Sequence, residues 1–208
     1  DFIFDKRRRR LGLPSRTGKD SIGHILFIKN EWPDVYKQTY KFLEPMDYLN
    51  FRLTGIPAAS YDTITGHWLT DNRDLSNVHY VDKLIALSGV DREKLPDLRP
   101  TGAVLGTITP EIAKEFGLRE DVRVVMGTPD TESAAIGSGA VRDFEPHLYI
   151  GTSSWLSCHV PFKRVDMATS ITSLPSGIPG RYFVATEQDI AGGCLTMFRD
   201  QVFWPSDE

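Results

Sequence analysis

The chain has 208 residues, of which 40% are hydrophobic and 25% are charged, with a formal net charge of −4 at pH 7 and an isoelectric point near 5.8. This composition is typical of a globular protein of one or two domains, and its acidic balance gives no electrostatic basis for binding nucleic acid. Two cysteines, Cys158 and Cys194, are too few for a disulfide scaffold, so we expect a reducing, cytoplasmic setting. No apolar run approaches the length of a transmembrane helix, and we expect no membrane partner.

A run of basic residues, Lys6–Arg10, is the first distinct feature of the chain. Such a run can mark nuclear import or a site for a polyanion. It has no interleaved aromatic residues and belongs to an acidic protein, so we expect a solvated loop.

The following segment, up to Gly55, predicts several short helices. Apolar residues recur at nearly the spacing of one helix face, at Ile22, Ile25, Leu26 and Ile28. Pro33 and Pro45 stand where helices can begin, because proline at the first helical position gives up only an N–H that has no partner there. Gly55 is a suitable helix end. Four aromatic residues could form a ligand platform, but their spacing favours a place in the core: Trp32, Tyr36, Tyr40 and Phe42.

Residues 58–71 are rich in side chains that can meet a polyol: Tyr61, Asp62, Thr63, Thr65, His67 and Trp68. The alternative is a threonine-rich strand or turn whose side chains hydrogen-bond to the local backbone. The sequence does not distinguish between these two interpretations. A short amphipathic helix should follow between Tyr80 and Ser88, and residues 91–100 are turn-rich.

A strand, a helix and a second strand are predicted in the middle of the chain, in support of an α/β fold. The first strand covers residues 102–108, and the helix begins after Thr109, with a proline and an acidic residue in its first turn. The β-branched run Val122–Met126 predicts a mostly buried strand.

Asp130 lies where this second strand ends and the next predicted helix, residues 131–139, begins. Aspartate is a favoured residue just before a helix, so a capping role is one explanation of its position. A carboxylate at the carboxyl end of a strand is also well placed to activate a substrate hydroxyl.

A hairpin with a hydroxyl-rich turn follows about twenty residues later. Its predicted strands are His147–Ile150 and Trp155–Val160, and its turn is Gly151–Ser154. The turn could be a plain hairpin connection, or its backbone N–H groups and hydroxyls could hold an anion. The order of the two features, a carboxylate followed by the hydroxyl-rich hairpin, suits hydroxyl activation opposite phosphate binding.

The last part of the chain predicts further strands and a terminal helix. Residues 166–181 indicate a long loop or a loose strand pair, residues 182–185 a strand and residues 194–203 a helix, on which Arg199 and Asp200 form a local ion pair. No histidine and cysteine spacing typical of zinc, no P-loop and no Gly-x-Ser-x-Gly elbow occurs.

Several segments together resemble the FGGY carbohydrate kinases. The segments GTPDTESAAIGSG and LYIGTSSWLS are similar to the family's G-x-x-D segment and second phosphate hairpin. The resemblance extends to ILFIKNEWPDVYKQTYKFLEPMDYLNFRLTG, SYDTITGHWLTD and ATEQDIAGGCLTMFRD. The family's first D-x-G-T hairpin and its Gly-rich adenosine motif do not occur in this sequence, so we expect the central part of a longer kinase.

The resemblance implies an actin-like (ribonuclease-H-like) fold of two domains, only partly represented. Residues 1–140 would be the end of the sugar-binding first domain, and residues 141–208 the start of the ATP-binding second domain. The implied reaction is the ATP-dependent phosphorylation of a sugar or polyol, most readily a pentulose such as xylulose, with Mg²⁺ at the phosphates. A homo-oligomer is possible in such a family.

The resemblance also assigns the site residues. Asp130 would be the general base and would contact the sugar together with Tyr61. The phosphates of ATP would bind to Gly151, Thr152, Ser153 and Ser154. Two alternatives from other classes are an inactive sugar-binding module and a structural actin-like protein.

Overall fold

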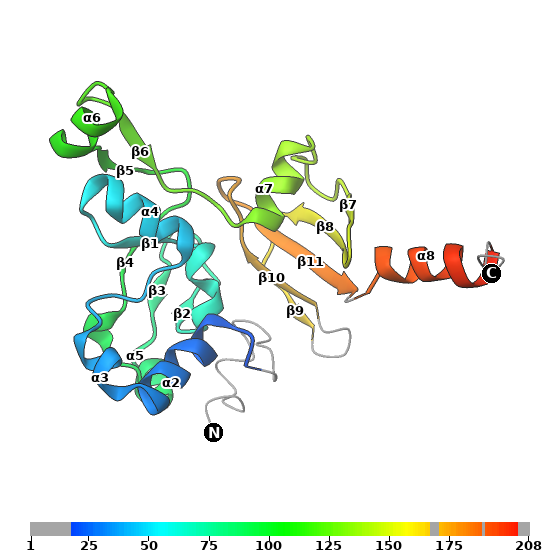
Figure 1. Cartoon of the computed structure of the whole chain (residues 1–208), viewed down its shortest axis with the longest axis horizontal. Helices are drawn as coiled ribbons and strands as arrows, with labels where there is room; N and C mark the ends of the chain where they lie inside the picture. Colours follow the sequence, from blue (N-terminus) through cyan, green and yellow to red (C-terminus); the bar gives the residue numbers. More distant parts are fainter. Residues whose placement is uncertain (1–17, 167–170, 189, 204–208) are drawn as a thin grey trace.

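Helices and strands alternate along the chain, which confirms the predicted α/β class (Figure 1). The computed structural model describes residues 18–166, 171–188 and 190–203, so the basic run Lys6–Arg10 lies outside the described residues. Three parts follow one another in sequence: helices with short strands, a small strand-helix-strand unit, and a five-stranded antiparallel sheet.

Short helices form the first part, as the apolar spacing and the prolines predicted. They are α2 (Ser21–Glu31), α3 (Pro33–Gln38), α4 (Pro45–Thr54) and α5 (Asp82–Ser88). Pro33 and Pro45 occupy the first helical positions, and α4 ends at Gly55, whose φ of 75° lies in the left-handed region that glycine adopts readily. The core that these helices cover is apolar and consists of Ile22, Ile25, Tyr36, Leu69, Leu84, Ile85, Val90 and Leu95.

The aromatic residues of this part divide between core and surface. Tyr36 is buried in the core and Phe42 packs against it, as expected from their spacing. Trp32 and Tyr40 are exposed instead. The core interpretation is therefore confirmed for two of the four aromatic residues.

Short strands and 3₁₀ turns connect these helices. Strand β1 (Ala58–Ser60) pairs in parallel with β4 (Asp97–Arg99), and β2 (Thr70–Asp71) pairs antiparallel with β3 (His79–Tyr80). The 3₁₀ turns are η2 (Thr63–His67) and η3 (Arg92–Lys94). Strand β4 lies in the segment predicted to be turn-rich, because its three residues form a strand only by pairing with β1.

The strand-helix-strand unit consists of β5 (Val104–Thr107), α6 (Pro110–Phe116) and β6 (Arg123–Val125). The hydroxyl of Thr109 accepts from the backbone N–H of Ile112, so the predicted cap of α6 is confirmed. The prediction that the strand over Val122–Met126 is mostly buried is wrong. Val124 and Met126 are buried, whereas Val125 is 48% exposed. The reason is that β5 and β6 form a two-stranded antiparallel ribbon, and only one face of it is covered.

The last part joins α7 (Asp130–Gly137) to an antiparallel sheet in the order β7-β8-β11-β10-β9. The strands are β7 (His147–Ile150), β8 (Ser154–Val160), β9 (Val165–Asp166), β10 (Ile171–Pro175) and β11 (Tyr182–Gln188). Figure 1 shows α7 beside β8, at the point where the chain passes from the ribbon to the sheet. The predicted hairpin is present. Of the two alternatives for residues 166–181, a long loop or a strand pair, the pairing of β9 with β10 supports the strand pair.

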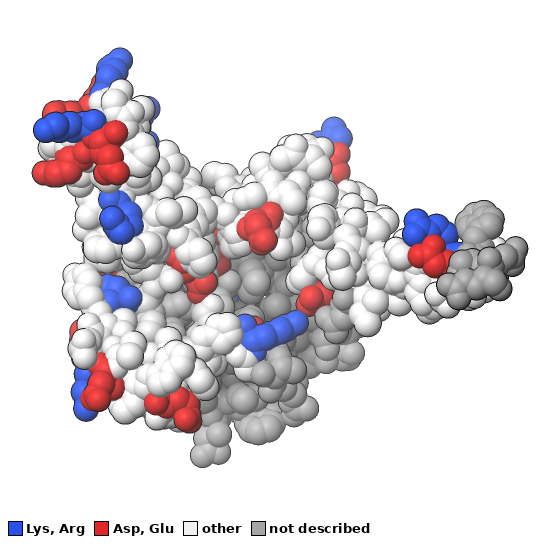
Figure 2. All heavy atoms as spheres, viewed as in Figure 1, with Lys and Arg blue, Asp and Glu red and all other residues white. Residues whose placement is uncertain are grey.

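Beyond the sheet, α8 (Gly192–Phe198) and the π-helical turn η4 (Arg199–Phe203) project away from the rest of the molecule (Figure 1). Neither has a buried residue, and Arg199 pairs with Asp200 at 2.6 Å, as predicted. Figure 2 shows this projection as mostly uncharged surface, with charge only near its tip. None of the helices in the described ranges has both the length and the apolar character that crossing a lipid bilayer requires.

Candidate functional site

Asp130 is the first residue of α7, directly after the turn that ends the β5–β6 ribbon. Its Oδ1 accepts from the backbone N–H of Thr131 at 2.7 Å and from the Thr131 hydroxyl at 3.3 Å. The side chain is exposed, and its Oδ2 makes no hydrogen bond to a described residue. Oδ2 can therefore accept a hydrogen bond from a ligand.

Two cavities meet at Asp130. One, of about 530 Å³, lies between α7 and the β7–β8 hairpin and is lined by Asp130, Ala134, Tyr149, Ser153 and Trp155, among others. The larger one, of about 770 Å³, lies between α7 and the helical part. Its polar lining comes from Ser21, Glu44, Thr63, Thr128, Asp130 and Ser133. Among the described residues, Asp130 alone lines both cavities.

The hairpin turn Gly151–Ser154 is fixed by backbone hydrogen bonds. The N–H of Gly151 donates to the carbonyl of Ser153 at 2.8 Å, and the N–H of Gly192 donates to the carbonyl of Gly151 at 2.8 Å. A Cβ on Gly192 would lie 2.2 Å from that carbonyl oxygen, so only glycine lets the start of α8 approach the turn this closely. Within the described part of the chain the hydroxyls of Thr152 and Ser153 have no hydrogen-bond partner, and Ser153 faces the smaller cavity.

Tyr61 lies apart from both cavities. It is half-buried in the turn after β1, where its backbone N–H donates to the carbonyl of Arg99 at 3.0 Å. It is not among the described lining residues of either cavity. The structure therefore brings Asp130 and the hairpin turn together, and Tyr61 does not join them.

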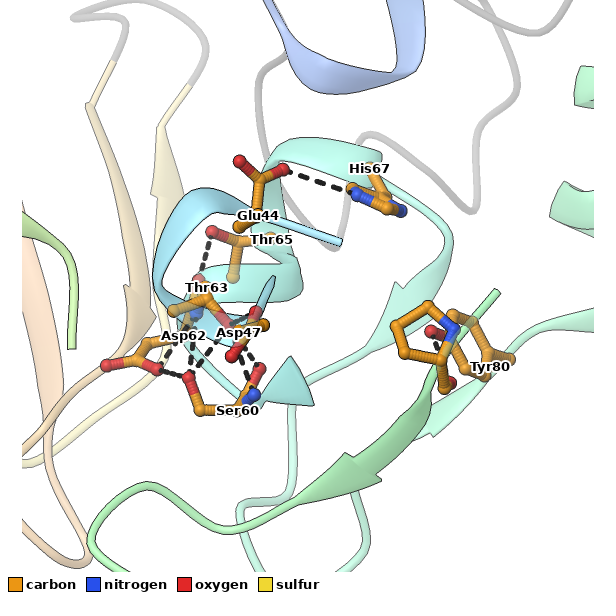
Figure 3. Close-up of polar contacts among 9 residues, drawn as sticks. Glu44, Asp47, Ser60, Asp62, Thr63, Thr65, His67 and Tyr80 are labelled. Carbon is orange, nitrogen blue, oxygen red and sulfur yellow. Dashed lines mark hydrogen bonds and ion pairs between the residues drawn. The ribbon is translucent and has the colours of Figure 1, made fainter. Parts of the chain in front are cut away.

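The polar residues around Tyr61 form local hydrogen bonds, which was the second interpretation of residues 58–71 (Figure 3). Asp62 Oδ1 accepts from the N–H of Thr63 at 2.8 Å and from the hydroxyls of Ser60 and Thr101. The Thr65 hydroxyl donates to the carbonyl of Asp62 at 2.7 Å. These contacts hold the turn that places Thr63 at the larger cavity.

A buried carboxyl, Asp47 on α4, completes this network and was not predicted. Its side chain is fully buried, and Oδ2 accepts from the Thr63 hydroxyl at 2.7 Å (Figure 3). Burial, which this hydrogen bond only partly offsets, raises the pKa of Asp47 to about 7. Asp47 and Asn50 are both buried and stand three residues apart on α4, so they share its inward face. The sequence alone does not show that two polar residues at this spacing face the interior of the protein.

Glu132, two residues after Asp130, is a second unpredicted buried carboxyl. It accepts from the hydroxyl of Thr128 at 2.9 Å and from the backbone N–H of Gly177, which lies between β10 and β11. Burial raises the pKa of Glu132 to about 7, against hydrogen bonds from Ser176, Gly177 and Thr128 that lower it. This side chain ties the helix of Asp130 to the sheet.

The groups at the smaller cavity suit phosphate oxygens better than a metal ion. Hydroxyl and backbone N–H groups of a tight turn donate to anions. No group of three or more His, Cys, Asp or Glu residues in the described ranges could hold a metal ion. A cation bound here would therefore depend mainly on its anionic ligand and on water.

Comparisons with known proteins agree on one family. Residues 2–137, well over half of the chain, match the sequence profile of the N-terminal domain of the FGGY family of carbohydrate kinases. The chain is similar to the xylulose kinase of Escherichia coli (31% identity, 82% of this chain and 34% of the relative) and to that of Bacillus subtilis (25% identity, 88% and 36%). A solved structure of a xyloylose kinase from Brucella ovis superposes with a TM-score of 0.79 at 21% identity, over 88% of this chain and 37% of that one. The chain thus spans about a third of the length of the curated relatives it matches.

Proposed function

Because the chain belongs to the FGGY family of carbohydrate kinases, we propose that the protein catalyses the ATP-dependent phosphorylation of a sugar or polyol hydroxyl. A pentulose such as xylulose is the substrate we favour, since the relatives include several xylulose kinases. The likeness to solved structures confirms the predicted actin-like (ribonuclease-H-like) kinase fold, of which this chain represents a part.

The observation that carries the proposal is the place of Asp130 between the two cavities. Phosphoryl transfer depends mainly on positioning the attacking hydroxyl in line with the phosphate. The sugar occupies the larger cavity, and the phosphates of ATP occupy the smaller one beside the hairpin turn. A group that lines both cavities is positioned where the two substrates meet.

Asp130 is the general base of this reaction. Its Oδ2 accepts the proton as the substrate hydroxyl attacks, while Oδ1 stays bonded to the backbone of Thr131 and holds the side chain in place. The partial positive charge at the N-terminus of α7 lies beside this carboxylate. Tyr61 remains a proposed sugar contact that no distance in this structure supports.

The hairpin turn binds the phosphates. Backbone N–H groups of the turn and the hydroxyls of Thr152 and Ser153 donate to the phosphate oxygens, and Gly151 and Ser154 delimit the turn. When bound, ATP supplies the transferred phosphoryl group, and Mg²⁺ supplies positive charge beside it.

The proposed domain border lies near Ala140, between the sugar-binding part, residues 1–140, and the ATP-binding part, residues 141–208. It is supported by the match to the family's N-terminal domain, which ends at residue 137. The border follows α7, so the general base would belong to the last helix of the first domain.

The substitution Asp130→Asn tests the base in the natural full-length protein. It should lower turnover about a hundredfold or more, because the amide cannot accept the proton, and it should change nucleotide affinity little. Steady-state kinetics with xylulose and calorimetry with a non-hydrolysable ATP analogue measure the two effects. Asp121→Asn is the control, because this exposed carboxylate pairs with Arg119 and lines neither cavity. Near-normal turnover in Asp130→Asn would show that another group is the base.

A further inference from the structure

The larger cavity contains a second carboxylate, Glu44, which stands directly before α4. Its side chain is 26% exposed and makes no capping hydrogen bond to α4. The side chain of Glu44 therefore remains available for contacts outside α4.

His67 holds the carboxylate of Glu44. Its Nε2 lies 3.3 Å from Glu44 Oε1, and the imidazole is almost fully buried in η2. Figure 3 shows the two side chains pointing toward each other across the turn that also carries Thr65. Burial alone would raise the pKa of Glu44, but hydrogen bonds from His67 and from Ser21 outweigh it, and the pKa is lowered. Glu44 is therefore a fixed negative charge at neutral pH.

The larger cavity has an acidic lining. Among the described residues that line it, the charged ones are Glu44 and Asp130, and both are acidic. The other lining side chains are hydroxyls or apolar groups, such as Ser21, Thr63 and Met46. Carboxylates accept hydrogen bonds from hydroxyl groups, and they repel a carboxylate brought to the same site.

We propose that Glu44 is a specificity-determining residue, which accepts hydrogen bonds from the hydroxyls of a neutral sugar and excludes sugar acids from the cavity. The inference rests on the proposed function, since it assigns the sugar to this cavity. Asp130 acts on the hydroxyl that is phosphorylated, whereas Glu44 selects the ligand at the opposite wall, on the side of the helical part.

Calorimetry with D-xylulose and D-xylonate tests the proposal in the natural full-length protein, because the two ligands share a five-carbon chain and differ in charge. The wild type should bind xylulose and bind xylonate at least tenfold more weakly. Glu44→Gln should weaken xylulose binding about tenfold and bring the two affinities close together, since the negative charge is gone. Glu44→Asp keeps the charge on a shorter side chain, so it should weaken xylulose binding and still exclude xylonate.

Two controls separate selection from folding. Glu31→Gln removes an exposed carboxylate at the end of α2, outside the cavity, and should leave both affinities unchanged. Thermal unfolding of each variant shows whether it folds. If Glu44 had a purely structural role, Glu44→Gln and Glu44→Asp would both weaken the binding of xylulose and of xylonate to the same extent. That result would overturn the proposal. A wild type that binds xylonate as tightly as xylulose, or binds neither, would overturn it as well.

Turnover of xylulose on the same samples separates this proposal from the proposed function. If the wild type phosphorylates xylulose and Glu44→Gln leaves the ratio of affinities unchanged, the role of Glu44 is wrong and the kinase function stands. If the ratio responds to Glu44→Gln but no phosphoryl transfer occurs, the kinase function is wrong and Glu44 still selects the ligand.

Discussion

Asp47 and Glu132 are carboxyls that the fold holds away from water. Asp47 is fully buried and Glu132 is 3% exposed. Burial raises the pKa of each to about 7, whereas an aspartate or glutamate in an unfolded chain titrates near pH 4. Both are therefore protonated in the folded protein at a pH where the unfolded chain has already lost the proton.

Stability should consequently fall as the pH rises. A carboxyl whose pKa is raised on folding contributes stability that is fully present below pH 4 and is lost as the pH passes through about 7. Between those values each group lowers the free energy of unfolding by about 1.4 kcal/mol per pH unit. Urea unfolding at pH 5, 6, 7 and 8 measures the slope. Asp47→Asn and Glu132→Gln should each have a flatter slope than the wild type, because an amide does not titrate.

The control for this measurement is Asp121→Asn, which changes an exposed carboxylate. It should reproduce the slope of the wild type. Slopes that are equal in all four proteins would mean that neither buried carboxyl is protonated at neutral pH.

The sequence predicted those site residues that stand at the boundaries of elements. Asp130 follows a β-branched run and a Gly-Thr-Pro turn, and the Gly151–Ser154 turn separates two strand-like runs, so local composition located both. Asp47, Glu132 and Glu44 could not be located in this way. Their burial and partners depend on residues far away in the chain, such as Thr63, His67 and Gly177.

Among the helices and strands, local signals were reliable where a single residue begins or ends an element. Proline at the start of α3 and α4 and glycine after α4 stand where they were expected. Strand β4 and the exposure of β6 were not predicted, because both depend on which other strand pairs with them or covers them. The sequence of a three-residue strand does not show which other strand it pairs with.

The contact between α8 and the hairpin turn yields a prediction for Gly192→Ala. The added methyl group would lie 2.2 Å from the carbonyl oxygen of Gly151, so the start of α8 must move and its backbone hydrogen bond to the turn is lost. We expect nucleotide affinity to fall about tenfold, because the displaced turn presents its N–H groups poorly, with sugar affinity unchanged. Calorimetry with an ATP analogue and with xylulose measures both.

The neighbouring glycine provides a matched control. A Cβ on Gly193 would meet only Ile190 Cγ2, at 3.6 Å, which is an ordinary contact. Gly193→Ala should therefore bind nucleotide like the wild type. If both variants lost nucleotide binding to the same extent, helix flexibility and not the contact with the turn would be responsible.

Taken as a whole molecule, these 208 residues should fold but should not carry out phosphoryl transfer alone. The chain spans about a third of the length of its relatives, and the sequence contains one proposed phosphate hairpin and no Gly-rich adenosine motif. Positioning of nucleotide and sugar contributes on the order of several kcal/mol to such catalysis, so its loss places the rate below routine detection. A coupled ATP hydrolysis assay with xylulose, alongside circular dichroism, tests both statements.

The isolated chain should also self-associate. Its projecting end exposes large apolar side chains, namely Leu195, Met197, Phe198, Val202 and Phe203. Exposed apolar patches of this kind drive association. Light scattering on the same sample measures it. Robust kinase activity from the 208 residues, absent in Asp130→Asn, would contradict the prediction and require a second nucleotide-binding feature within this chain.

The hydrogen bond from Gly177 to Glu132 has a mechanical consequence for movement between the two proposed domains. It locks α7, and with it Asp130, to the sheet that bears the hairpin turn. If the two proposed domains hinge near Ala140, the motion must stretch this hydrogen bond, because Glu132 lies before that border and Gly177 lies after it. Asp130 and the hairpin turn should therefore stay together until the contact between Glu132 and Gly177 breaks.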